Sequence, residues 1–168
     1  MNEVYGSIKR LSENIVEICS EHSLKISTAE SCTGGMISAA ITSVSGSSSV
    51  IELGVCSYSS RIKHDLLRVS EQTIEKFSEY STQCVEEMAR GALKLSDADF
   101  AVSTSGIAGP SGGTEEDPIG TVYISVCGMG HTKTEKHVFE DQGRDYIRAA
   151  ATEKALNMLL ETIKYTLS

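Results

Sequence analysis

The sequence predicts an α/β protein, a single three-layer α/β/α domain with a mixed, mostly parallel sheet. In the first half of the chain, short apolar segments typical of strands alternate with longer amphipathic segments typical of helices. In the second half, two strand-like segments are separated only by the turn sequence G-M-G-H, which indicates an antiparallel hairpin. The 168 residues can form one hydrophobic core, and no linker or repeat divides them, so we expect one domain over residues 1–168.

The first half of the chain contains two helix and strand pairs. Apolar residues recur at helical spacing over 4–19, which predicts an amphipathic helix. A short strand at 24–28 and a helix at 35–44 follow. The serine-rich segment 45–49 predicts a turn before a second strand at 50–57.

The middle of the chain is charged and predicts helices that cover the sheet. One helix is expected at 59–67, a short one begins at Ser70, and a longer one over 82–95 has Ser81 as its N-cap. A buried strand is then expected at 99–104. It leads into the loop 105–113, whose four glycines indicate unusual backbone dihedrals or close approach of a ligand.

The last segments complete the predicted sheet and cover it. Strands at 120–127 and 133–139 form the expected hairpin, and 144–167 predicts a long closing helix with one apolar face. In open α/β sheets, ligands bind outside the carboxyl ends of the strands. The loops 29–35 and 105–113 follow such ends, so both are candidate binding loops.

Composition excludes several classes of function. Fifteen basic and 23 acidic residues give a net charge of −8, so a general nucleic-acid footprint is absent. No apolar run approaches the length of a membrane span, and the first residues, M-N-E-V-Y-G, lack the pattern of a signal peptide. The five cysteines and four histidines are scattered singly, so we expect neither disulfides nor a metal site. These features favour a cytoplasmic protein without a metal or cofactor.

The segment S-T-A-E-S-C-T-G-G, at 27–35, is the candidate site for nucleophilic chemistry. It joins a predicted strand to a predicted helix, where free backbone N–H groups attract anions and developing oxyanions. Ser31 and Cys32 both offer a nucleophile there, and Gly34 and Gly35 would let another molecule approach the backbone. An ordinary N-cap is the alternative interpretation, because serine and threonine are common at that position.

A serine nucleophile needs a base, and none of the four histidines is singled out by its position. Lys63, in Y-S-S-R-I-K, is an alternative base if burial or a neighbouring cation keeps it neutral, and Arg61 and Arg144 are candidate cations. A solvated helical lysine is the ordinary alternative.

Four ordered motifs resemble those of the CinA C-terminal domain family, whose enzymes are nicotinamide-nucleotide amidases. The motifs are T-A-E-S-C-T-G-G (28–35), G-V-C-S-Y-S-S-R-I-K (54–63), S-G-I-A-G-P-S-G-G (105–113) and P-I-G-T-V-Y (118–123). The resemblance covers about 13–160. It implies hydrolysis of the carboxamide of nicotinamide mononucleotide to nicotinic acid mononucleotide and ammonia by a serine–lysine mechanism. Full CinA proteins carry a further N-terminal domain, and this chain resembles the stand-alone amidase.

The resemblance also implies residue roles. Ser31 falls on the nucleophile and Lys63 on the base, with Tyr58 beside it. The segment F-E-D-Q-G-R-D-Y-I-R resembles F-x-G-D-R with one insertion, which leaves Arg144 as the match and Arg148 as the fallback. Backbone N–H groups at 32–35 would stabilise the oxyanion, and the loop 105–113 with Arg144 would hold the ribose phosphate, unless that loop is a structural turn. The expected substrate-binding residues are Glu30, Cys32, Thr33, Gly34, Gly35, Ser105, Gly106, Gly109 and Arg144.

Two other functions remain possible from the sequence. One is a non-catalytic, competence-associated interaction module, which an acidic surface would suit. The other is a transferase or kinase that uses the glycine loop for phosphate, although no G-x-x-x-x-G-K-[ST] motif is present. The expected partners are a small-molecule nucleotide and, because of the edge hairpin and the terminal helices, a second copy in a homodimer.

Overall fold

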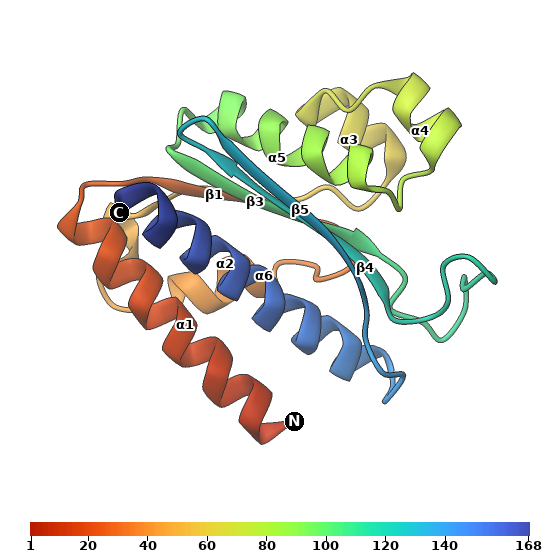
Figure 1. Ribbon diagram of the computed structural model, residues 1–168, viewed down its shortest axis with the longest axis horizontal. Helices are drawn as coiled ribbons and strands as arrows, with labels where there is room; N and C mark the ends of the chain where they lie inside the picture. The colour runs from red at the N-terminus through yellow and green to blue at the C-terminus, as the bar shows by residue number, and fades with distance from the viewer.

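A five-stranded sheet covered by helices on both faces forms the protein, and the computed structural model describes all residues, 1–168 (Figure 1). The helices on one face are α1 (Asn2–Glu21), α2 (Met36–Thr42) and α6 (Arg144–Leu167), and those on the other are α3 (Ser60–Leu67), α4 (Glu71–Phe77) and α5 (Thr82–Ser96). The predicted three-layer α/β/α architecture is therefore confirmed.

The strands lie in the order β2-β1-β3-β4-β5. Their bounds are Ile26–Glu30 for β1, Ile51–Cys56 for β2, Phe100–Gly106 for β3, Thr121–Gly128 for β4 and His131–Val138 for β5. The first three strands pair in parallel, whereas β4 and β5 pair antiparallel and form the predicted hairpin. The sheet is thus mixed, and the carboxyl ends of its three parallel strands share one edge.

At this edge, two predicted boundaries are wrong by two residues. Glu30 belongs to β1, because it pairs with both β2 and β3, so the first loop begins at Ser31 rather than at 29. Ser105 and Gly106 belong to β3, because they pair with β4, so the glycine-rich loop begins at 107. In both cases a neighbouring strand extends the backbone ladder beyond what local composition indicates.

The hydrophobic core is divided unequally between the two faces. The cluster that includes residues of α1, α2 and α6 has 24 buried residues, and the cluster that includes α5 has 11. Helices α1 and α6 also pack against each other, so much of the apolar surface of both is buried within the chain. The smaller cluster lies on the side of the sheet that carries α3 and Lys63.

No helix of the structure is both long enough and apolar enough to cross a membrane. All five cysteines are free thiols. No three histidine, cysteine, aspartate or glutamate side chains lie together in an arrangement that could hold a metal ion.

Candidate active site

Ser31 lies in a tight turn at the carboxyl end of β1. Its N–H donates to the carbonyl oxygen of Thr104 on β3, at 2.9 Å, and its own carbonyl accepts from the N–H of Gly34, at 3.0 Å. On the other side of β1, the N–H of Ser57 donates to the carbonyl of Glu30, at 2.8 Å. The turn is therefore fixed to the ends of the parallel strands, where α/β sheets bind ligands.

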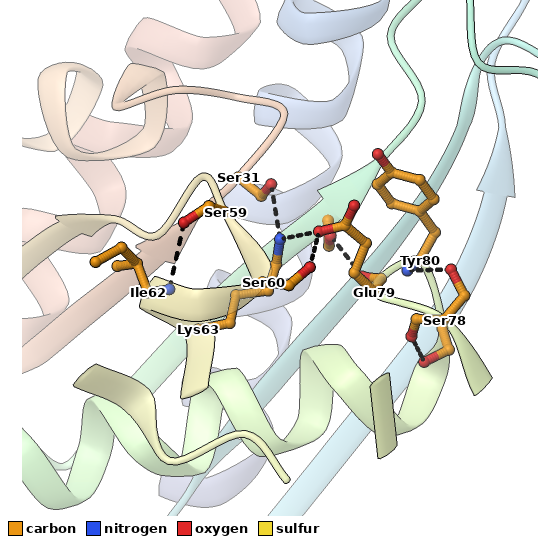
Figure 2. Close-up of polar contacts among 10 residues, drawn as sticks. Ser31, Ser59, Ser60, Ile62, Lys63, Ser78, Glu79 and Tyr80 are labelled. Carbon is orange, nitrogen blue, oxygen red and sulfur yellow. Dashed lines mark hydrogen bonds and ion pairs between the residues drawn. The ribbon is translucent and has the colours of Figure 1, made fainter. Parts of the chain in front are cut away.

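Lys63 reaches this turn from the first turn of α3. The Ser59 hydroxyl accepts a hydrogen bond from the N–H of Ile62 and so caps the start of α3. Lys63 is the fourth residue of this helix and lies on its inward face. The Lys63 side chain is completely buried, and its Nζ donates to Ser31 Oγ at 3.3 Å (Figure 2). A solvated helical lysine, the ordinary alternative, is thus wrong.

Glu79, from the loop between α4 and α5, is the second partner of Lys63. Its Oε2 lies 3.0 Å from Lys63 Nζ and also accepts from Ser60 Oγ at 2.8 Å (Figure 2). Ser105 Oγ donates to the backbone carbonyl of Glu79 at 2.8 Å and so fixes its loop. Burial acts to raise the pKa of the Glu79 carboxyl, but the Ser60 hydrogen bond and the Lys63 charge lower it below its ordinary value.

The prediction that a cation lies beside Lys63 is wrong. Arg61 points to the surface and pairs with Asp65 at 2.8 Å, and Arg144 contacts other groups. The charged neighbour is instead the Glu79 carboxylate, 3.0 Å from Lys63 Nζ. Sequence analysis missed Glu79 because its segment, F-S-E-Y-S, has no spacing relation to Ser31 or Lys63.

Cys32 is a poor nucleophile in this environment. Burial raises the pKa of its thiol to about 12, even though its own N–H and the Lys63 charge favour the thiolate. The side chain is 4% exposed. Of the two candidate nucleophiles, Ser31 is the one that shares a hydrogen bond with the lysine.

Of the four backbone N–H groups after Ser31, two donate to an acceptor oxygen and two do not. Gly34 donates to the Ser31 carbonyl, and Gly35 donates to a Glu30 carboxylate oxygen at 2.9 Å. The N–H groups of Cys32 and Thr33 have no acceptor oxygen among the hydrogen bonds of the structure. The expected oxyanion donors at 32–35 are therefore reduced to these two.

Glu30 does not face a ligand. Its side chain is completely buried, and its oxygens accept from the N–H groups of Gly35, Ile37 and Ser38 and from Ser38 Oγ. A carboxylate there satisfies the free N–H groups at the beginning of α2. The geometry thus indicates a helix cap rather than the expected contact with substrate.

The two glycines of the turn leave room for side chains of this same chain. A Cβ on Gly34 would lie 3.1 Å from Arg148 Nη2, and one on Gly35 would lie 3.3 Å from Cys56 Sγ. Both glycines also have positive φ angles, 60° and 91°. The space expected for an approaching molecule is thus filled by Arg148 and Cys56. Thr33 faces inward too, and its Oγ1 lies 2.7 Å from Thr104 Oγ1.

Tyr58 and Arg144 lie at the open side of the site. The Tyr58 side chain is 59% exposed, and its hydroxyl accepts from Arg144 Nη2 at 3.0 Å, not from Lys63. Arg144 Nη1 donates to the carbonyl of Gly109 at 2.7 Å. Arg144 therefore connects the glycine-rich loop to Tyr58.

Ser105 and Gly106 are structural residues of β3. The Ser105 hydroxyl is used on the Glu79 carbonyl, and a Cβ on Gly106 would lie 2.3 Å from the carbonyl oxygen of Thr121. Gly109 has a φ of 77° and gives its carbonyl to Arg144. Of these three expected substrate contacts, only Gly109 lies beside a cation.

Arg148 binds the turn itself. Its Nε donates to the carbonyl of Cys32 at 3.1 Å, and its Nη2 donates to the carbonyl of Thr33 at 3.0 Å. The two arginines are therefore distinguished by the structure: Arg144 contacts Tyr58 and Gly109, whereas Arg148 contacts the residues that follow Ser31.

The fold and this site define a single-sheet α/β protein with a buried serine–lysine pair at the carboxyl edge of its parallel strands. The profile of the CinA C-terminal domain matches residues 8–163. The chain belongs to the CinA C-terminal domain family, as the four motifs predict.

Relatives differ in length and in what their names say. The nicotinamide-nucleotide amidohydrolase PncC of Enterobacter agglomerans is 45% identical over 158 residues, which are 92% of this chain and 96% of that protein. A CinA-like protein of Thermotoga neapolitana is 40% identical over 162 residues, 96% of this chain, but the match spans only 39% of that relative's length. The crystal structure of the competence/damage inducible protein CihA from Agrobacterium tumefaciens superposes with a TM-score of 0.91 at 40% identity, covering 92% of this chain and 94% of that one.

Proposed function

We propose that this protein is an amidase that hydrolyses the carboxamide of nicotinamide mononucleotide to nicotinic acid mononucleotide and ammonia. The observation that carries the proposal is the buried contact of 3.3 Å between Lys63 Nζ and Ser31 Oγ. The substrate is proposed from the name of the Enterobacter agglomerans relative, a nicotinamide-nucleotide amidohydrolase that this chain matches over nearly its whole length.

The proposed reaction has two acyl-transfer steps. Neutral Lys63 takes the proton of the Ser31 hydroxyl as Oγ attacks the amide carbon, and a tetrahedral oxyanion forms. The N–H groups of Cys32 and Thr33 stabilise that oxyanion. Lys63 then gives its proton to the leaving nitrogen, and ammonia departs. Water, deprotonated by Lys63, then attacks the acyl carbon of the ester at Ser31. As the bond from that carbon to Ser31 Oγ breaks, Lys63 returns the proton to Oγ, and the acid is released.

Glu79 positions the base of this reaction. Its carboxylate holds Lys63 Nζ against Ser31 and is itself held by Ser60 Oγ. A buried lysine with one hydroxyl and one carboxylate partner is costly to desolvate, which supports a chemical role over a non-catalytic interaction module.

Arg144, Tyr58 and Gly109 are the proposed contacts of the ribose phosphate end. A guanidinium has five N–H donors, and Arg144 uses two nitrogens on Gly109 and Tyr58, so donors remain for a phosphate. The exposure of Tyr58 leaves this group open to a ligand. The five free thiols suit a reducing compartment, which favours the expected cytoplasmic location.

The proposed function is tested by ammonia release from nicotinamide mononucleotide. The wild-type protein should hydrolyse it before and after treatment with EDTA, and Ser31→Ala and Lys63→Ala should lose nearly all activity. Lys63→Arg should be equally inactive, because a guanidinium does not deprotonate in a useful pH range. If Lys63→Arg keeps more than about a tenth of the wild-type kcat/KM, a loss of only ~1.4 kcal/mol, Lys63 is not the base. A folded wild-type protein that releases no ammonia from nicotinamide mononucleotide would show that the proposed substrate is wrong.

A further inference from the structure

Arg148 is the side chain whose contacts the proposed reaction does not yet use. It lies on α6, and its Nε and Nη2 donate to the carbonyls of Cys32 and Thr33, the two residues that follow the nucleophile. Its third nitrogen, Nη1, lies 3.9 Å from an Asp145 carboxylate oxygen. The shortest contacts of Arg148 are thus its hydrogen bonds to the backbone of the turn.

The carbonyl of Cys32 belongs to the same peptide unit as the N–H of Thr33. That peptide is trans, since the only cis bond in the chain is Gly109–Pro110, so its carbonyl and N–H point in opposite directions. A donor that binds the carbonyl from one side fixes the plane of the peptide and directs the N–H to the other side. Hydrogen bonds in series also polarise one another, so a charged donor on the carbonyl strengthens the N–H as a donor.

The N–H of Thr33 is one of the two free N–H groups next to Ser31. The other peptide that Arg148 binds, through the carbonyl of Thr33, carries the N–H of Gly34, which closes the turn by donating to Ser31. The absence of a Cβ on Gly34 admits the guanidinium, because a Cβ there would lie 3.1 Å from Nη2. One arginine therefore contacts both peptides that shape the backbone after the nucleophile.

We propose that Arg148 is the positioning residue of the oxyanion hole. Through the Cys32 carbonyl it orients and polarises the peptide whose N–H, that of Thr33, stabilises the tetrahedral intermediate formed on Ser31. The inference rests on the proposed amidase function and assigns Arg148 to the chemical step. It separates Arg148 from Arg144, which contacts the glycine-rich loop and suits the phosphate end.

The test compares Arg148→Lys with Arg90→Lys, a matched change at an exposed arginine of α5 whose nearest carboxylate is that of Glu86, 3.8 Å away. A lysine at 148 keeps the charge but cannot bind both carbonyls in the planar arrangement of a guanidinium. Loss of an oxyanion donor costs ~10²–10³ in rate, so a misaligned donor should lower kcat by about 10- to 100-fold. KM and the acid limb of the pH profile should stay unchanged, because neither the phosphate contacts nor Lys63 is altered. Arg90→Lys should leave kcat unchanged.

Three results would overturn the inference. An unchanged kcat would show that the contact does not affect the reaction. A raised KM with normal kcat would make Arg148 a substrate contact. The third result is a lower melting temperature, such that part of the protein is unfolded at the assay temperature, together with a normal kcat per folded molecule. The role of Arg148 would then be purely structural. In Arg148→Ala, added guanidinium ion at a non-denaturing concentration should restore part of kcat, and no restoration by any concentration would count against the inference.

A second measurement separates this inference from the proposed substrate. An alkyl fluorophosphonate reacts with an activated serine: the Ser31 Oγ–P bond forms, the P–F bond breaks, fluoride leaves and the serine proton passes to Lys63. The oxygen of the phosphoryl group then occupies the oxyanion position. If the wild-type protein is labelled at Ser31 but does not hydrolyse nicotinamide mononucleotide, the proposed substrate is wrong. The inference is then supported by slower labelling of Arg148→Lys than of Arg90→Lys and overturned by equal rates. If the wild-type protein is neither labelled nor active, both proposals fail.

Discussion

The contacts of Lys63 determine how the serine could be activated. Lys63 Nζ lies between Ser31 Oγ, whose proton it takes in the proposed reaction, and the Glu79 carboxylate. The lysine side chain is completely buried, so these two groups fix the position of its amine. Glu79 therefore determines the geometry of the serine–lysine pair.

Replacing Glu79 by glutamine should lower kcat/KM. Glutamine has nearly the same size, but it lacks the carboxylate that holds Lys63 Nζ at 3.0 Å, so the amine is less firmly positioned against Ser31. The measurement is kcat/KM for the wild type, Glu79→Gln and the control Glu75→Gln, an exposed glutamate of α4. A kcat/KM of Glu79→Gln that equals that of the wild type would contradict the role of Glu79.

The stability of the same variant should depend on pH with a defined sign. The pKa of Glu79 is lowered in the folded state, so its carboxylate stabilises the fold above the unfolded pKa of ~4.3, and this contribution disappears as the pH falls through the folded value. The difference in free energy of unfolding between wild type and Glu79→Gln should therefore be largest near neutral pH and should vanish in strong acid. Urea unfolding at several pH values measures it.

Ser31 and Cys32 should behave oppositely on truncation. Ser31→Ala should lose nearly all ammonia release, whereas Cys32→Ala should keep most of it, because burial raises the pKa of the Cys32 thiol to about 12 and leaves it protonated at neutral pH. Cys19→Ala, at a buried thiol of α1, is the control for packing loss. Loss of activity in Cys32→Ala with retention in Ser31→Ala would transfer the nucleophilic role to the thiol.

At the scale of elements, α3 is held in place by the close approach of α5. A Cβ on Gly91 of α5 would lie 1.9 Å from the carbonyl oxygen of Leu67, the last residue of α3. Leu67 lies one helical turn after Lys63, so this contact supports the end of the helix that carries the proposed base. The glycine is needed here for the approach of two backbones.

Gly91→Ala should destabilise the protein, and Gly6→Ala should not. The first change forces α5 away from α3 and should lower the free energy of unfolding by about 1–3 kcal/mol, the usual cost of overpacking. In α1, a Cβ on Gly6 would meet only an Arg10 side-chain nitrogen at 3.6 Å, so alanine there should raise stability by up to about 1 kcal/mol. Urea denaturation of the two variants measures both values. Equal changes in the free energy of unfolding would show that the space between α5 and α3 admits a methyl group at residue 91.

At the scale of the whole molecule, the surface available for a second copy is narrower than expected: the edge hairpin is open, but the terminal helices are largely covered. The terminal helices α1 and α6 pack on each other, so they supply less apolar surface than their sequences indicate. The open elements are the two edge strands of the sheet, β2 and β5. β5 is rich in charge, with Lys133, Glu135 and Lys136, which is typical of an edge protected against uncontrolled pairing.

The homodimer nevertheless remains our prediction, because closed two-fold dimers are the commonest assembly. Light scattering at micromolar protein concentration should give twice the mass of the chain. If charged residues of an edge strand contribute, the dimer should weaken as salt is added, since salt screens exposed ion pairs. A single species with the mass of one chain at every concentration would contradict the prediction.

Local sequence patterns determined the secondary structure of this protein and the choice of its candidate catalytic residues. Hydrophobic periodicity predicted the order and type of the elements, and the hairpin followed from its turn sequence, because both signals depend on neighbouring residues. The motifs selected Ser31 and Lys63, which the structure brings within 3.3 Å of each other, although their roles remain predictions.

The tertiary structure alone decided what surrounds that pair. It placed Glu79 beside Lys63, turned Glu30 inward as a helix cap and directed Arg148 to the carbonyls after Ser31. The contacts of Glu79 and Arg148 join separate elements of the chain, and they depend on which strands are neighbours and on which face each helix lies. The Glu30 contact is local, but it depends on the direction in which α2 leaves the sheet. A charged residue has the same sequence signature whether it meets solvent, a backbone or another charge, so only the packing of the elements could distinguish these cases.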